Sequence, residues 1–337
     1  MSLAAGALAA VVLAAHPGHA DWTPVDITHG PAPFGALFIG REIGAFKLLA
    51  AIDLDAEERR FGGYSGLVVS KDGGRLIAVS DAGTWLAAEI DRSEAGAIIG
   101  LSNAVTAPIL GEDDAPLTDK LSSDAESLTV TGRSVLIGFE RRHRIQRHSL
   151  DTARYHHAGA VAVPEGLKDA PSNSGLESLV ALEDGRLILL TERLRVEGEA
   201  GAVRGWIGGP AAWLPFAYRP APEHAPTDAA LSLDGTRLYV VERAYSQQKG
   251  VRIRITETPL ANLIEGAVVE PLVLATLGVG APVDNFEGLA VARGPDGGER
   301  LYLISDDNFS KRQNTLFLEF ARPMSYQKEA EPELPDL

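Results

Sequence analysis

Short apolar runs recur along the chain in pairs, and a few turn residues separate the two runs of each pair. Apolar runs of about 4 to 8 residues between turn residues are typical of β-strands. The second run of each pair is the clearer one, and the five second runs read RLIAVS, SVLIGF, RLILLT, RLYVVE and RLYLIS. In four pairs an Asp-Gly dipeptide lies between the runs, at 72–73, 184–185, 234–235 and 296–297. Asp-Gly favours a type I′ turn, so the pattern predicts a series of β-hairpins.

These hairpins form a repeat. Each first strand begins with an acidic or small polar residue before a leucine, and the leucines are Leu67, Leu128, Leu179, Leu231 and Leu289. A spacing of roughly 50 to 60 residues, with two clear strands and space for two weaker ones, is the size of a four-stranded propeller blade. Segments 251–260 and 270–277 supply such weaker strands. The sequence therefore predicts an all-β fold, a single β-propeller of four-stranded antiparallel blades, and leaves five or six blades open.

The last repeat needs a strand from elsewhere in the chain. After its hairpin it has only one further strand, 315–320, so its blade is incomplete. Segment 51–54 (AIDL), near the start of the chain, is the natural donor that closes the ring. A basic stretch alternates with Ile145 and Leu150 and predicts an exposed third strand, although it could instead grip a substrate phosphate. Its basic residues are Arg141, Arg142, His143, Arg144, Arg147 and His148.

Composition and charge exclude several classes of function. The chain has 337 residues, 31 Lys plus Arg, 46 Asp plus Glu and a net charge of -15. A nucleic-acid-binding surface needs clustered Lys and Arg, so no nucleic-acid partner is expected. The absence of cysteine excludes disulfides, thiolate metal sites and a Cys nucleophile.

The chain divides into three parts. Residues 2–15 form an apolar run, and the small residues before Asp21 suit a cleavage site, which predicts a signal peptide over 1–20. The run has no preceding Lys or Arg, so an inefficient anchor is the alternative. The propeller domain then spans 21–322, and a flexible acidic tail spans 323–337. We expect a periplasmic or secreted monomer without stable membrane insertion after signal cleavage.

The hairpins have a consequence for the acidic residues. In a propeller the first strand of each blade lines the central channel, and the second strand returns antiparallel to it. Residues at the start of the first strand and at the end of the second therefore share one face. The acids at the strand starts are Glu126, Glu177, Asp228 and Glu287, with Asp124 and Asp284 just before them. The acids at the strand ends are Asp81, Glu140, Glu192, Glu242, Asp306 and Asp307.

In such a ring of acids, either several carboxyl groups are protonated or cations lie among them. Two unit charges about 4 Å apart repel by roughly 1 kcal/mol in water and about 4 kcal/mol at an intermediate dielectric. A bound Ca²⁺ fits, because this ion takes six to eight oxygen ligands. Asn173, Asn285 and Asn308 lie in the same loops and could add amide oxygens. The alternative is purely structural, because arginines directly follow Glu140, Glu192 and Glu242 and could pair with these acids, leaving no place for an ion.

Several of these segments resemble a known family. The segments are GGYSGL (62–67), SDAESL (123–128), DNFEGLAV (284–291) and SDDNFSKRQNTLFLEF (305–320). They are similar to the bacterial phytase-like propellers described as esterase-like activity of phytase, over about residues 60–320. The resemblance implies an exported propeller whose recurrent acids mark a phosphoester-hydrolysing site. The matched positions are Glu126, Glu177, Asp228, Glu242, Arg243, Asp284, Asn285, Glu287, Asp306, Asp307, Asn308 and Gln313.

The function predicted from these observations is an exported, Ca²⁺-dependent phosphoric ester hydrolase acting on a small-molecule phosphoester at the channel mouth. The predicted metal ligands are Glu126, Glu177, Asp228, Glu242, Asp284, Glu287, Asp306 and Asp307. The predicted catalytic residues are Glu287, Glu177, Glu126 and Arg243. The predicted substrate-binding residues are Arg193, Arg243, Asn285, Asn308 and Gln313. Two alternatives stay open: a non-catalytic periplasmic binding or scaffold propeller with structural calcium, and a calcium-dependent carboxylic ester or lactone hydrolase.

Overall fold

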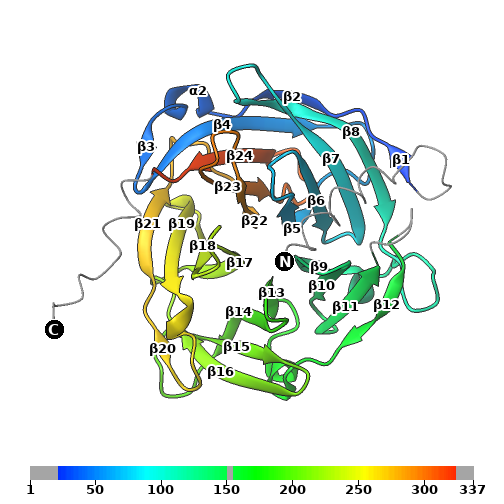
Figure 1. Ribbon diagram of the computed structural model, residues 1–337, viewed down its shortest axis with the longest axis vertical. Helices are drawn as coiled ribbons and strands as arrows, with labels where there is room; N and C mark the ends of the chain where they lie inside the picture. Colours follow the sequence, from blue (N-terminus) through cyan, green and yellow to red (C-terminus); the bar gives the residue numbers. More distant parts are fainter. Residues whose placement is uncertain (1–21, 150–154, 324–337) are drawn as a thin grey trace.

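Five small antiparallel sheets surround a central axis in the computed structural model, which describes residues 22–149 and 155–323 (Figure 1). The chain is thus a five-bladed β-propeller, which confirms the predicted fold class and settles the number of blades. The predicted signal peptide, 1–20, lies outside the described residues. The predicted tail, 323–337, also lies outside them except for its first residue.

The innermost strand of each blade lies nearest the axis and contacts the innermost strands of the neighbouring blades (Figure 1). These strands are β5 (Tyr64–Val69), β9 (Ala125–Thr131), β13 (Leu176–Ala181), β17 (Ala225–Leu231) and β22 (Phe286–Arg293). The second strands are β6 (Arg75–Ser80), β10 (Ser134–Phe139), β14 (Leu187–Arg195), β18 (Arg237–Ser246) and β23 (Glu299–Ser305). A second strand packs against neighbouring blades on both faces, so its apolar run is nearly continuous.

The outer strands complete the blades. The third strands are β7 (Thr84–Arg92), β11 (Arg144–Ser149), β15 (Val203–Gly209), β19 (Gly250–Pro259) and β24 (Thr315–Ala321). The fourth strands are β8 (Ile98–Pro108), β12 (His157–Val161), β16 (Ala212–Tyr218), β21 (Leu272–Leu277) and β4 (Phe46–Asp55). Short additions at the periphery are β1 (Thr23–Pro24), β2 (Thr28–Pro31), β3 (Glu42–Ile43) and β20 (Val268–Val269).

In residues 22–149 and 155–323, helical structure is confined to short segments between strands. The segments are α2 (Gly35–Phe38), α3 (Lys120–Ser123), η1 (Glu165–Asp169) and η2 (Leu260–Asn262). None of the helices among the described residues has the length and apolar character needed to cross a membrane.

Strand β4, near the start of the chain, closes the ring. It pairs antiparallel with β24, from Thr315 opposite Leu54 to Ala321 opposite Lys47, with a register shift between Glu319 and Phe320. The predicted donor segment 51–54 lies within this strand, so the predicted closure is confirmed. Apolar clusters fill the spaces between blades, and one of them joins Leu76 and Leu86 of the first blade to Phe317 of the last.

Two local expectations were wrong. The Asp-Gly hairpins are not type I′ turns, because only the glycine of each pair has positive φ, for example 71° at Gly73. Asp72 instead accepts the Gly74 N–H at 3.1 Å, and this side-chain bond stabilises a longer loop. The third strand β11 is also not simply exposed, because His148 is fully buried against Trp85 with ring centroids 5.5 Å apart.

Candidate functional site

The hairpins bring the acids to one face of the ring. In the second blade, Phe139 at the end of β10 pairs with Ala125 at the start of β9. Ser305 at the end of β23 pairs in the same way with Phe286 at the start of β22. The residues just beyond these strand ends therefore lie beside the starts of the innermost strands. We call this face the mouth, and we call the opposite face, which carries the Asp-Gly hairpin loops, the turn face.

The second blade holds a compact acidic triad at the mouth. Asp124 precedes β9, Glu126 lies within β9, and Glu140 follows β10. One carboxylate oxygen from each residue lies within 4.8 Å of the others. Asp124 and Glu140 are buried, and the Glu140 N–H donates to the Asp124 carbonyl at 2.9 Å. Three carboxylate oxygens at this spacing form a donor set that suits a hard divalent cation such as Ca²⁺.

The acidic region extends across several blades. Burial raises the pKa of Glu126 well above its usual value, and the charges of Glu287, Asp124, Glu140 and Asp81 raise it further. These residues come from the first, second and fifth repeats, which lie far apart in the sequence. The structure therefore places Glu126 and Glu287 near each other, as the hairpin geometry predicts.

Glu177 of the third blade joins the triad through Glu140. Burial raises the pKa of Glu177 well above its usual value, and the Glu140 and Glu126 charges act in the same direction. Burial also raises the pKa of Glu140 to about 7, although hydrogen bonds from Glu177 and from the Gly175 N–H oppose this shift. A hydrogen bond between the two side chains thus links Glu177 to Glu140.

Asp306 and Glu287 form the fifth-blade side of the mouth. Burial raises the pKa of Asp306 to about 8, with a further contribution from the Glu287 charge. The Asn285 amide donates to Glu287 Oε1 at 3.0 Å and to Asp306 Oδ2 at 3.2 Å. Burial raises the pKa of Glu287 too, although the Arg243 guanidinium, 3.3 Å from Glu287 Oε1, opposes that shift.

The basic groups at the mouth are unevenly distributed. Arg193 pairs with Glu192 at 3.1 Å, and Arg243 reaches from the fourth blade to Glu287 in the fifth. No ion pair joins Glu126, Glu140 or Glu177 to a basic side chain in residues 22–149 and 155–323. The predicted structural alternative, in which an arginine neutralises each acid, therefore does not describe these three glutamates.

Asp124, the remaining member of the triad of Asp124, Glu126 and Glu140, forms ion pairs with two basic side chains. Arg141 Nε is 2.5 Å from Asp124 Oδ2, and Lys120 Nζ is 2.5 Å from Asp124 Oδ1. Lys120 Nζ also lies 2.6 Å from Asp81 Oδ2, while Asp81 Oδ1 is buried and has no hydrogen-bond partner among the described residues. This carboxylate oxygen lies on the neighbouring blade and is not one of the three grouped oxygens of the triad.

Two of the predicted metal ligands, Asp228 and Glu242, accept hydrogen bonds from other groups of the protein. Asp228 accepts the backbone N–H of Ala229 at 2.8 Å and of Leu289 at 2.7 Å, so its carboxylate links the fourth and fifth blades. Glu242 is fully buried and accepts the Tyr218 hydroxyl at 2.8 Å. Their role as ligands stays a prediction, and the structure gives both of them a structural role.

Two further predicted ligands stabilise loops at the rim of the mouth. Asp284 accepts the N–H groups of Asn285 at 2.8 Å and Asn314 at 2.9 Å. Asp307 accepts the Gly63 N–H at 3.0 Å, and Gly63 has a φ of 67°. Carboxylates used in this way have fewer lone pairs left for an ion.

Two predicted substrate contacts lie in the same rim. The exposed Asn308 has a left-handed backbone, and its N–H donates to Asp306 Oδ1 at 2.6 Å. Gln313 donates to Asp284 Oδ1 at 3.4 Å. Their contact with a substrate stays a prediction.

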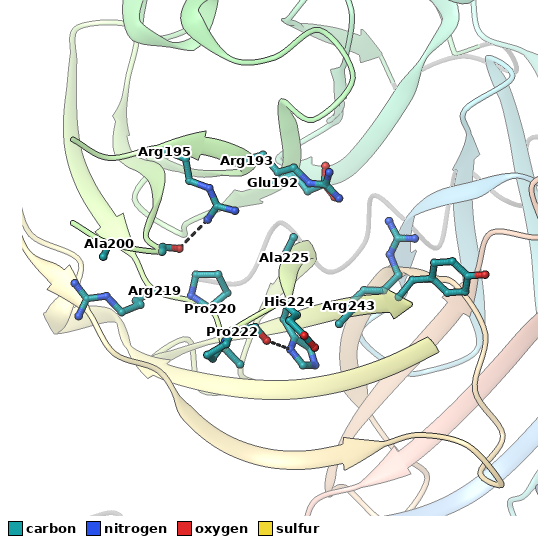
Figure 2. Close-up of a pocket in the computed structure, with 15 residues that line it drawn as sticks. Glu192, Arg193, Arg195, Ala200, Arg219, Pro220, Pro222, His224, Ala225 and Arg243 are labelled. Carbon is teal, nitrogen blue, oxygen red and sulfur yellow. Dashed lines mark hydrogen bonds and ion pairs between the residues drawn. The ribbon is translucent and has the colours of Figure 1, made fainter. Parts of the chain in front are cut away.

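A cavity of about 880 Å³ opens between the third and fourth blades, beside the acidic region. Its lining includes Glu192 and four arginines, Arg193, Arg195, Arg219 and Arg243. Figure 2 shows Arg193 and Arg195 extending from β14, with Arg243 on the neighbouring β18 and Arg219 on the far side. The cavity places guanidinium groups next to carboxylates, an arrangement suited to an anionic substrate that meets a cation.

The set of metal ligands predicted from the sequence does not include Asp81, Asp124 or Glu140, and the sequence predicts no role for Lys120. The three acids do occupy the repeat positions at the strand ends and starts, so the repeat itself could have identified them. Lys120 lies in the connection between the first two blades, outside the repeat, and no sequence signal points to it.

A five-bladed propeller with a buried carboxylate cluster at one mouth defines the class of this protein. A family model described as phytase-like, esterase-like activity of phytase, matches residues 59–309. The chain belongs to this phytase-like family. A search of curated proteins finds no match to it.

Proposed function

We propose that the protein is a calcium-dependent hydrolase of small phosphoric esters, with its site at the mouth. The observation that carries this proposal is the group of Glu126, Glu140 and Glu177, which lack a basic partner in the described chain. Membership in the phytase-like family supports a hydrolase acting on small molecules. A set of donors made only of oxygen favours a hard ion, and Ca²⁺ accepts six to eight such ligands.

The acidic triad would hold the cation. Asp124, Glu126 and Glu140 offer three oxygens within 4.8 Å of one another, and the orphaned Asp81 oxygen lies on the neighbouring blade. When bound, the cation would supply positive charge against the phosphate oxygens and against the charge that develops during hydrolysis. The net charge of -15 is then compatible with an anionic substrate.

Arg243 and Arg193 would orient the substrate phosphate. Both line the cavity beside the acids, and a guanidinium can donate two parallel hydrogen bonds to phosphate oxygens. Arg243 also contacts Glu287, so phosphate binding and the position of Glu287 are linked.

Glu287 is the proposed general base. Its contacts with Arg243 and Asn285 both involve Oε1, so Oε2 can accept a proton from an attacking water. The two contacts fix the orientation of the carboxylate, which a base needs if it is to act on one particular water molecule.

Hydrolysis of a carboxylic ester is the second candidate function. The family description refers to esterase-like activity, and the same mouth could stabilise the oxyanion of an acyl ester. A purely structural or scaffold role is the third reading, in which the cation stabilises the ring without any turnover.

Hydrolysis assays separate these three functions. The purified protein is mixed with an aryl phosphate monoester, an aryl phosphate diester and an aryl acetate, each with added Ca²⁺ or with a chelator. Calcium-dependent turnover of a phosphate ester that falls at least about 100-fold in Glu287→Gln supports the proposal. The matched control is Glu183→Gln, an exposed acid outside the mouth. Turnover of the acetate alone supports the second function, and no turnover by folded, calcium-loaded protein supports the scaffold.

Export is part of the same proposal. The apolar run over 2–15 and the small residues before Asp21 support cleavage after Ala20. N-terminal sequencing of the protein from fractionated cells tests it. A first residue Asp21 in the periplasmic or secreted fraction is expected, and an intact Met1 in the cytoplasmic fraction would contradict it.

A further inference from the structure

The ammonium group of Lys120 lies among oxygen atoms at the mouth. Lys120 Nζ is 2.6 Å from Asp81 Oδ2, 2.5 Å from Asp124 Oδ1 and 3.1 Å from the Asp81 carbonyl oxygen. These groups belong to the first and second blades, and Lys120 reaches them from the short helix α3. Two carboxylate oxygens and a carbonyl oxygen are also the ligands that a hard divalent cation prefers.

Both oxygens of Asp124 already have cationic partners. Lys120 contacts Oδ1, and Arg141 contacts Oδ2 at 2.5 Å. Glu126 and Glu140, the other two members of the triad, have no basic partner in the described chain. A cation that uses all three members therefore competes with one of the two basic groups for an oxygen of Asp124.

Lys120 is the group that can leave more easily. Its side chain is 48% exposed, whereas that of Arg141 is 28% exposed. Arg141 is also held by a second bond, to Asn173 Oδ1 at 2.6 Å. An ammonium on a flexible four-carbon stem is well hydrated once it is released into water.

We propose that Lys120 is an internal competitor for the divalent cation. Its ammonium neutralises Asp81 and Asp124 while the site holds no ion, and a divalent cation binds by displacing it into solvent. The proposal rests on the proposed function in one respect only, namely that the cation binds at the acidic triad. It adds that Lys120 sets the cation concentration at which the site fills.

The charges at the mouth explain why such a competitor is useful. Without Lys120, the orphaned oxygen of Asp81 and the carboxylate of Asp124 would lie near Glu126 with less compensation. The ammonium lowers this repulsion in the cation-free protein, and the exchange of one positive charge for two favours the loaded state when the ion is abundant.

Calcium titrations of three purified variants test the competition. Isothermal titration calorimetry with CaCl₂ compares the wild type, Lys120→Met and Lys168→Met. Lys168 is a matched control because its ammonium pairs with Glu165 on the surface, in η1. We expect about tenfold tighter calcium binding by Lys120→Met and no change for Lys168→Met. Equal or weaker binding by folded Lys120→Met would overturn the proposal, as would no binding by any of the three proteins.

A second measurement uses the wild type and needs no variant. An amine-reactive reagent labels the protein with and without CaCl₂, and mass spectrometry quantifies the label on each lysine. Calcium should raise the labelling rate of Lys120 several-fold and leave that of Lys168 unchanged. A Lys120 rate that calcium does not change would overturn the proposal.

These results remain distinguishable from a failure of the proposed function. Calcium exchange with Lys120 but no ester hydrolysis would refute the hydrolase and leave the competition intact. Calcium-dependent hydrolysis with unchanged affinity in Lys120→Met would refute the competition alone.

Discussion

Buried acids occur on both faces of this propeller, and the two faces treat them differently. On the turn face, Glu319 is fully buried and Arg92 lies 2.9 Å from its Oε1, with the Tyr302 hydroxyl donating at 3.2 Å. Glu257, on the same face, contacts the buried Arg322. At the mouth, Glu126 and Glu177 lie near other acids and have no such partner in the described residues.

The difference between the two faces indicates that a buried acid with a purely structural role is paired with a basic side chain of the same chain. An isolated buried charge costs several kcal/mol, and a paired one loses much less. The turn face supplies that pair from the chain itself, between β7 of the first blade and β24 of the last. At the mouth, Glu126, Glu140 and Glu177 lie together without equivalent pairing in the described part of the chain, and such an arrangement suits a partner that comes from solution.

The largest expected effect comes from breaking the pairing on the turn face. Arg92→Met leaves Glu319 buried without its closest cation, and we expect the free energy of unfolding to fall by about 3 kcal/mol. Urea denaturation with and without calcium measures it, and the loss should be the same in both conditions. The control Arg186→Met removes an exposed pair with Asp184 and should leave the free energy of unfolding nearly unchanged. A small loss in the free energy of unfolding of Arg92→Met would contradict the proposed difference between the two faces.

The pH dependence of stability gives the next effect. The pKa of Glu140 is about 7 in the folded chain, above its value in the unfolded chain, because of burial. The unfolded state therefore releases this proton first, and stability falls as pH rises from about 4.5 to about 7. Glu140 alone contributes a loss of about 3 kcal/mol in the calcium-free protein, and the raised pKa values of Asp306, Glu126 and Glu177 add to this loss. Denaturation at several pH values should show this slope, and Glu140→Gln should make it shallower. A rising stability over the same interval would contradict the assignment.

A smaller effect separates structural acids from ligands within the predicted set. Asp228 accepts two backbone N–H groups and links two blades, so Asp228→Asn should destabilise the protein by about 1 to 2 kcal/mol. Its calcium affinity should stay within twofold of the wild type, roughly the scatter expected for an uninvolved site. Glu126→Gln is the matched mouth variant, and it should lose calcium affinity instead. Loss of calcium binding in Asp228→Asn with unchanged stability would contradict this assignment and support Asp228 as a metal ligand.

The smallest expected effect has the opposite sign. Glu177→Gln removes a carboxyl group from the crowded mouth and keeps its size, so the calcium-free protein should gain about 0.5 to 1 kcal/mol at pH 7.5. The same substitution at Glu319 on the turn face should destabilise, because it leaves Arg92 without its partner. Destabilisation by Glu177→Gln would show that this carboxylate stabilises the fold.

The repeat predicted much of this structure. The innermost and second strands, and the closing segment 51–54, follow from apolar runs and turn residues. The number of blades did not follow, because a repeat of this length fits five or six of them. The residues beyond those needed for five blades lie in peripheral strands such as β1 and β20 and in the connection that carries Lys120.

The candidate site could be predicted in outline. The repeat placed the acids at one face because hairpin ends are adjacent. It could not distinguish Asp228, which accepts backbone N–H groups, from Glu126, which has no basic partner in the part of the chain that the structure describes, because both occupy similar repeat positions. Those differences depend on which backbone and basic groups a neighbouring blade presents, and the pattern within one blade does not contain that information.

The central claim is that the mouth carboxylates bind a divalent cation. X-ray diffraction from crystals soaked in TbCl₃, with data collected near the terbium absorption edge, tests it most directly. The claim predicts an anomalous peak among the carboxylates of Asp124, Glu126 and Glu140, removed by Glu126→Gln. An empty mouth at millimolar Tb³⁺, with these carboxylates ordered and accessible in the crystal, would contradict it.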